Sequence, residues 1–331
     1  MSMPVKRKYS QRFPEPGDPA RGHLPPLHPR PGLSATGSGP EAGNQLIKII
    51  RRRMEAVREV ARLSAMNPEP DGIHDVRVAS RRATECVGIM ASGKIIKRSQ
   101  AEAVVRLLRK MRRHGGKLRD MDVFLYDLSA RGQRADEKAL AAISARVASR
   151  RAGAIRAFIQ SAMVVAVDPR MAGMMRILDQ TELPVLRATL QRGLVRRIKR
   201  NRKRLLFNLN EAFAQRTVGA MHQARIAGKR MRYVCEIGDA ANLTDTRRLR
   251  GSLRQFQQLV GELNDAAAAQ TRLADINTSS LPVDTSCRRL SRKLQAIQQR
   301  RMARLLPRTM TLARSLDRLV RGMNLPTATP S

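Results

Sequence analysis

Apolar residues recur every three or four positions along most of the chain, from about residue 44 to about residue 320. This spacing is typical of amphipathic α-helices, and no stretch alternates apolar and polar residues long enough to predict a β-strand. Gly and Pro fall mostly between the periodic segments. The pattern predicts an all-α protein, with helices over 44–65, 72–91, 97–114, 119–130, 136–165, 170–180, 184–214, 217–238, 244–261, 263–275 and 284–320.

The first 43 residues differ from the rest of the chain. They are rich in Pro, Gly and Arg and have no hydrophobic period, which predicts a disordered basic tail ahead of a helical domain over 44–325. The opening "MSMPVKRKYSQRFPEPG" has no apolar core and so does not predict a signal peptide. The longest apolar run, "MVVAV", is too short to span a bilayer. We expect a soluble, cytoplasmic protein with no membrane contact.

Two stretches of the helical region carry the same pattern of histidine and basic residues. Residues 73–90 read "IHDVRVASRRATECVGIM" and residues 221–238 read "MHQARIAGKRMRYVCEIG". "GKLRD" (116–120) likewise recurs as "GELND" (261–265), and "LIK" (46–48) as "LVR" (194–196). Because the matches keep their order, they predict an internal duplication. We expect two pseudosymmetric four-helix bundles, over about 44–166 and 184–325, that face each other.

Composition adds a strong charge to this picture. The chain of 331 residues has a formal net charge of +37 and a pI near 11.7, which predicts a polyanionic partner or an acidic surface. Aromatic residues are only 3% with no Trp, and this disfavours readers of single-stranded nucleic acid, which stack bases on aromatic rings. The three widely spaced cysteines indicate reduced thiols, with Cys86 and Cys235 as small core residues.

The repeated motifs place cations along one face of each helix. His74, Arg77 and Arg81 share a face in the first copy, as do His222, Arg225, Lys229 and Arg232 in the second. Like charges at this spacing cost roughly 0.2–0.5 kcal/mol per pair, a cost that a bound polyanion would remove. Two solvated charged faces are the alternative interpretation, but solvation does not require the same residues at the same spacing twice.

The ordered motifs resemble the CHAD family, the conserved histidine α-helical domain. The resemblance rests on H-x-x-R-[VI]-x-x-x-[RK]-R in both halves, "KLRDMDVFL" (117–125), "KRMRY" (229–233) and "LVGELNDAA" (259–267), and covers about residues 44–320. It implies two helical bundles around a basic central cavity that binds inorganic polyphosphate without catalysis or a cofactor. Members of this kind are associated with polyphosphate granules, so the resemblance implies a place at granules or at the nucleoid.

The resemblance also assigns residues to the cavity by position. These are His74, Arg77, Arg81 and Arg82 from the first half and His222, Arg225, Lys229, Arg230, Arg232 and Tyr233 from the second. Thr84 departs from the pattern, because the first motif commonly has Arg or Lys there. The first half would therefore bind more weakly at that end, or use Arg109, Arg113 or Lys117 nearby.

The histidines and aspartates allow two interpretations each. An imidazole has an ordinary pKa near 6.5, which a bound polyanion would raise, so we expect tighter binding at mildly acid pH if His74 and His222 contact the ligand. The alternative is that each only bridges helices by hydrogen bonds. Asp120 and Asp265 occupy matched positions at predicted helix starts, where a carboxylate caps backbone N–H groups or pairs with Arg.

Two other functions compete with polyphosphate binding. "IHD" suggests a metal-dependent phosphohydrolase, but a catalytic metal needs several converging ligands, and His74 and Asp75 point about 100° apart on a helix. We therefore expect no metal site and no enzymatic activity. A nucleic-acid binder is the stronger rival, because +37 attracts DNA and RNA at low salt and "RRIKRNRKR" (196–204) suits either partner. No helix-turn-helix or zinc-finger pattern is present.

Overall fold

The computed structural model describes residues 40–131, 137–278 and 285–321, and within these ranges it contains helices and no strand. The prediction of an all-α protein is confirmed. Residues 1–39 of the predicted tail (1–43) and residues 322–325 of the predicted domain lie outside the described residues. The helices are α1 (Pro40–Met66), α2 (Pro70–Ser92), α3 (Arg98–Arg131), α4 (Glu137–Val167), α5 (Pro169–Gln180), α6 (Leu183–Gln215), α7 (Val218–Ala240), α8 (Arg247–Thr278) and α9 (Thr285–Arg321).

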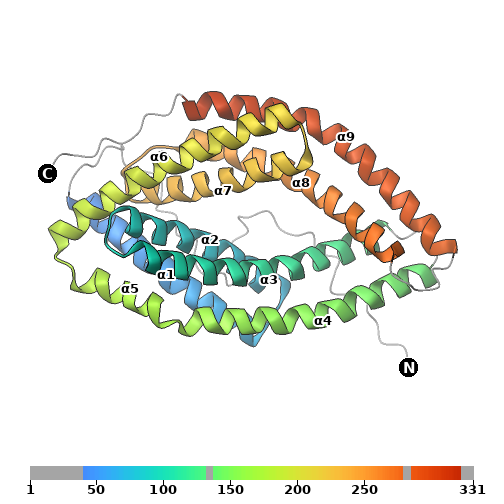
Figure 1. Cartoon of the computed structure of the whole chain (residues 1–331), viewed down its shortest axis with the longest axis horizontal. Coiled ribbons are helices and arrows are strands. Elements are labelled where there is room, and N and C mark those ends of the chain that lie inside the picture. The colour runs from blue at the N-terminus through green and yellow to red at the C-terminus, as the bar shows by residue number, and fades with distance from the viewer. Residues whose placement is uncertain (1–39, 132–136, 279–284, 322–331) are drawn as a thin grey trace.

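The long helices pack in two groups, which lie side by side in Figure 1. In the first group α1 packs on α2 and α4, and α3 packs on the same two helices; in the second group α6 and α8 each pack on α7 and α9. The short α5 connects the groups. Helices α1 and α2 also contact α6 and α7, and we call these contacts the joint. The internal duplication and the boundary between the two halves stay predictions.

Two pairs of predicted helices are single helices in the structure. The predicted break between 97–114 and 119–130 lies inside α3, and that between 244–261 and 263–275 lies inside α8. Gly115 explains the first, because a Cβ there would lie 3.3 Å from the Phe158 ring and 3.4 Å from Ile73. A glycine costs a helix about 1 kcal/mol relative to alanine, and here it lets α3 pack closely against its neighbours.

Helix α1 begins at Pro40, four residues before the predicted start at 44, so the last part of the predicted tail is helical. Ala42 and Gly43 are buried. A Cβ on Gly43 would lie 2.7 Å from the side chain of Arg187 on α6. The first turn of α1 therefore packs against the second group of helices, and tertiary contact overrides the weak helical signal of its sequence.

The joint depends on close approach of α2 and α6. A Cβ on Gly193 of α6 would lie 2.3 Å from the backbone oxygen of Ile89, and one on Gly93, just after α2, would lie 2.5 Å from the backbone oxygen of Thr189. The buried apolar residues of both groups form one continuous core. Cys86 and Cys235 are free and buried in it, as the sequence predicts.

Candidate anion-binding site

The apolar stripes of α2 and α7 set the direction of their cationic faces. In α2 the predicted stripe is buried: Ile73, Val76, Ala83, Val87 and Met90. In α7 the corresponding stripe is buried as well: Met221, Ala224, Ala227, Met231 and Val234. Because these stripes pack into the core, the histidines and basic residues of both helices stand on the sides that the core leaves free.

The cationic faces of α2 and α7 meet. Burial lowers the pKa of Lys229 well below its ordinary value, and the positive charges of Arg81, Arg225 and Arg77 lower it further. Arg81 and Arg77 belong to α2, about 150 residues away along the chain. The sequence assigns residues of both α2 and α7 to one site, and in the structure their charges lie close enough to affect each other.

His74 shows how open this region is. Its side chain is exposed to solvent, yet desolvation by the surrounding protein, followed by the charges of Arg119, Arg77, Arg81 and Lys229, lowers its pKa to about 4. A side chain that water reaches from one side, with protein and cations on the others, behaves in this way. At neutral pH in the free protein, His74 is uncharged.

His222 occupies a similar position on α7. Desolvation and the charge of Arg225 lower its pKa, while the side chain of Asn264 on α8 acts in the opposite direction. The imidazole therefore lies close to a side chain of a neighbouring helix, and whether it bridges the two helices stays a prediction.

Helix α3 supplies two cations that sequence reasoning missed. Arg119 is the charge that lowers the pKa of His74 most. Arg112 donates to the hydroxyl of Thr84 at 2.9 Å and to the backbone oxygen of Ser80 at 3.1 Å. Burial and the charge of Arg81 lower the pKa of Arg112 to about 10. Arg112 thus reaches the position where Thr84 departs from the motif.

The role of a helix cap is wrong for both aspartates. Asp120 lies inside α3 and Asp265 inside α8, far from the free backbone N–H groups of a helix start. Their other predicted role fits: the charge of Asp120 raises the pKa of Arg77, and that of Asp265 raises the pKa of Arg225. Burial outweighs this effect and leaves the pKa of both arginines lowered, that of Arg77 to about 10.

These residues form a group that we call the central cationic cluster. Its members are His74, Arg77, Arg81, Arg119, His222, Arg225 and Lys229. Arg225 is held by a hydrogen bond of 2.9 Å from its Nε to the backbone oxygen of Gln257. The Nε of Arg77 is buried and has no hydrogen-bond partner. The cluster therefore presents basic side chains from three helices, α2, α3 and α7, and at least one of its N–H groups is not used by the protein.

Arg82 and Arg232 lie at a second group of charges, which we call the Glu236 cluster. Its members are Arg53, Arg82, Arg232 and Glu236. The arginine nitrogens approach the carboxylate at 4.0, 3.5 and 3.7 Å respectively. The guanidinium of Arg232 also stacks over the ring of Tyr233, 4.9 Å from its centroid. Tyr233 itself is buried.

The remaining predicted residues lie at the edge of this region. Burial and the charge of Arg204 lower the pKa of Arg230, and Arg109 lies close enough to lower it further. Arg109, Arg113 and Lys117 are exposed along α3. Whether any of them contacts a ligand stays a prediction.

A buried ion pair ties α2 to α6 beside these residues. Glu85 is 1% exposed and accepts hydrogen bonds from Arg197 at 2.8 Å and from Asn201 at 3.0 Å. We call these three residues the Glu85 cluster. Asn201 also donates to the backbone oxygen of Arg230 at 3.3 Å. The Glu85 cluster therefore links α2, α6 and α7.

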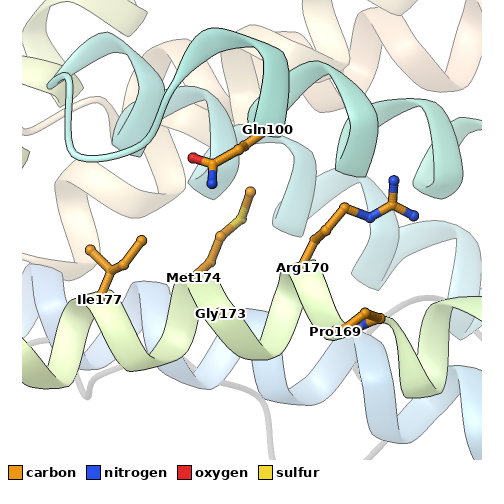
Figure 2. A pocket seen from close by; sticks show the side chains of 6 residues that line it. All are labelled: Gln100, Pro169, Arg170, Gly173, Met174 and Ile177. Carbon is orange, nitrogen blue, oxygen red and sulfur yellow. The ribbon is translucent and has the colours of Figure 1, made fainter.

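Other features of the molecule do not overlap the central cationic cluster. Gln100, Pro169, Arg170, Gly173, Met174 and Ile177 line a mostly apolar pocket between α3 and α5 (Figure 2). Its only cation, Arg170, pairs with Asp168 at 2.6 Å. Within the described ranges, no His, Cys, Asp and Glu side chains gather in threes where they could bind a metal ion. None of the described helices is long and apolar enough to cross a membrane.

The family of the chain follows from comparison with known proteins. The CHAD domain model matches residues 48–274, so the chain belongs to the CHAD domain family, which is known for polyphosphate binding. A crystal structure of the CHAD domain from the plant Ricinus communis has a TM-score of 0.60 at 18% identity, covering 92% of this chain and 99% of its own.

A second solved structure has the same fold. PptA from Streptomyces chartreusis has a TM-score of 0.57 at 15% identity, covering 85% of this chain and 100% of its own. At these identities the two structures establish a shared fold. A comparison with curated proteins gives no match.

Proposed function

We propose that this protein binds inorganic polyphosphate at the central cationic cluster and catalyses no reaction there. The observation that carries the proposal is the meeting of His74, Arg77 and Arg81 of α2 with Arg225 and Lys229 of α7, which pack against each other. Burial and the neighbouring positive charges, that of Arg81 among them, lower the pKa of His74, Arg77, Arg225 and Lys229. Such crowding is unfavourable in the free protein. A polyanion between the two helices would relieve it.

The shape of the cluster suits a linear anion. Residues 74 to 81 of a helix span about 10 Å, so each cationic face runs past several units of a phosphate chain. The guanidinium groups offer planar pairs of donors for phosphate oxygens, and Lys229 offers a compact charge. The unpartnered Nε of Arg77 is available as one such donor.

A binding role without catalysis is consistent with the family, whose members are generally non-catalytic binding domains. The cluster supplies charge and hydrogen-bond donors, which are what a polyanion carrier needs. We further propose that polyphosphate binding recruits the protein to polyphosphate granules. Nucleic acid competes for the same charge at low salt.

Calorimetric titration of the full chain with linear polyphosphate of defined length, at about 150 mM salt, tests the proposal. We expect Arg81→Ala and Lys229→Ala each to weaken binding roughly tenfold or more, because each removes charge-assisted hydrogen bonds. Lys199→Ala, on the exposed side of α6, is the matched control and should have a small effect.

Competition with duplex DNA at the same salt separates the two partners. We expect excess polyphosphate to displace DNA. If DNA displaces polyphosphate, or if Lys199→Ala weakens binding as much as Lys229→Ala does, the proposed site is wrong.

A further inference from the structure

The Glu236 cluster carries more positive charge than its carboxylate can neutralise. Three guanidinium groups surround one carboxylate, so the cluster has a net charge of +2. No Nε in the cluster donates a hydrogen bond: those of Arg53, Arg82 and Arg232 are all buried and unpartnered, as is Nη1 of Arg53. Two of these four nitrogens, the Nε atoms of Arg82 and Arg232, face the Glu236 carboxylate at 3.5 and 3.7 Å without forming a hydrogen bond, and the other two belong to Arg53.

Arg53 is the most unusual member. It is 6% exposed, and burial lowers its pKa, with the charge of Arg82 acting in the same direction. A charge in such a position that is only partly compensated, here by Glu236 at 4.0 Å, is unfavourable. Buried donors without a protein acceptor are rare, and a bound ion is one of their ordinary explanations. A guanidinium kept here is therefore best explained by an anion.

The Glu236 cluster adjoins the central cationic cluster. The charge of Arg232 lowers the pKa of both Lys229 and Arg225. Arg82 follows Arg81 directly on α2, and Arg232 lies about one turn after Lys229 on α7. A chain bound along the central cationic cluster would therefore reach Arg232 and the Glu236 cluster at one end.

We propose that Arg53, Arg82 and Arg232 form a subsite for the terminal phosphate of a linear polyphosphate chain. This inference rests on the proposed function. An internal phosphate unit carries one negative charge, whereas a terminal phosphate, like a phosphate monoester, carries about −1.5 to −2 at pH 7. The net charge of the cluster matches the end of the chain. An internal unit would leave the cluster only half neutralised.

Blocked chain ends test this assignment in the full-length protein. The probes are two linear polyphosphates of the same length, one with free terminal phosphates and one with both ends blocked as phosphoramidates. We expect the wild type to prefer the free-ended probe about tenfold, in line with the charge-assisted hydrogen bonds that a terminal phosphate gains. In Arg53→Gln the preference for the free-ended probe should be reduced, because this variant lacks the complete subsite.

Arg52→Gln is the matched control. Arg52 is the neighbour of Arg53 on α1 but is exposed, so the variant loses the same charge and should keep the preference. Because blocking an end also removes charge from the probe, the difference between Arg53→Gln and Arg52→Gln is the decisive quantity. Equal preferences in these two variants overturn the assignment.

Glu236→Gln gives an independent test of opposite sign. Removing the carboxylate raises the net charge of the cluster from +2 to +3, which attracts a doubly charged end more than a singly charged unit. Binding should therefore tighten for both probes, and the preference for free ends should grow. A variant that leaves both affinities at their wild-type values overturns the assignment. If instead Lys229→Ala binds both probes as tightly as the wild type, the proposed function itself fails, which is a different result.

Discussion

Glu85 and Glu236 each meet arginines at the joint, but they meet them differently. Glu85 is 1% exposed and is bonded at 2.8 Å by Arg197 and at 3.0 Å by Asn201. The side chain of Glu236 is 12% exposed and has three arginines at 3.5 to 4.0 Å. Glu85 thus has one arginine and one asparagine within hydrogen-bonding distance, whereas Glu236 has three arginines at longer distances.

The difference teaches which arginines serve the fold. A buried ion pair with short hydrogen bonds uses its donors fully, and removing one partner leaves a charge uncompensated. A group of arginines that shares one distant carboxylate keeps unused N–H groups. Arg197 is therefore part of the joint's structure, whereas Arg53, Arg82 and Arg232 keep buried N–H groups that make no hydrogen bond within the protein.

The largest expected effect compares the two clusters directly. Arg197→Gln leaves Glu85 buried without a charged partner, so the free energy of unfolding should fall by about 3–5 kcal/mol. Arg53→Gln removes a buried charge and two unpartnered donors, so the unfolding free energy should stay the same or rise. Denaturant unfolding of both variants measures the difference. Equal losses would show that the Glu236 cluster is as structural as the Glu85 cluster.

A change at the α2–α6 contact should loosen only one cluster. Gly193 lies one turn before Arg197 on α6, and an added Cβ would lie 2.3 Å from the backbone oxygen of Ile89. Gly193→Ala should force the helices apart and cost about 1–3 kcal/mol. Denaturant unfolding checks this value. The accompanying change in the free energy of polyphosphate binding should be much smaller.

Gly153→Ala is the control for the glycine itself. Nothing lies within 4 Å of a Cβ at that exposed position of α4, so the substitution should stabilise the protein by about 0.5–1 kcal/mol. If Gly193→Ala also stabilises the protein, α2 and α6 do not approach as closely as the structure shows.

The smallest effect concerns pH and the central cationic cluster. The pKa of His74 is about 4 in the free protein, below its ordinary value of about 6.5. The folded state therefore favours the neutral ring, and stability from this source is lost as the pH falls from about 6.5 toward about 4. A polyanion bound beside His74 would raise this pKa, so affinity should rise as the pH falls toward about 4.

Titrations from pH 8 to pH 5 at constant ionic strength measure this linkage. Because terminal phosphates also take up protons in that range, the informative quantity is the difference between the wild type and His74→Gln. We expect a few-fold gain in affinity at acid pH that the variant lacks. Parallel pH profiles for the two proteins would assign His74 to a structural role.

Much of the site was predictable because helical spacing places residues on faces. His74, Arg77 and Arg81 share a face whatever α2 packs against, and the same holds for His222, Arg225 and Lys229. Arg112 and Arg119 were missed for a specific reason: Gly115 and Gly116 predicted a break. Read as one helix, α3 places these two arginines seven residues apart and on one face.

The capping role predicted for Asp120 and Asp265 was wrong for the same reason. Asp120 and Asp265 follow glycines that resemble helix ends, and a helix start would have made them caps. Gly115 instead allows close packing against the Phe158 ring, and a Cβ on Gly261 would lie 2.9 Å from the guanidinium of Arg225. Packing decided these positions, and packing partners far along the chain leave no local signal.

Periodicity and repeated motifs alone determined that this protein is helical and that α2 and α7 each carry a row of cations, because both properties depend on residues a few positions apart. The tertiary structure decided the rest. It placed Arg53 of α1 beside Arg82 and Arg232, so that three arginines share the single carboxylate of Glu236, and it gave Glu85 close partners on α6. Charges interact through space, so which arginines pair and which stay available depends on how distant helices pack.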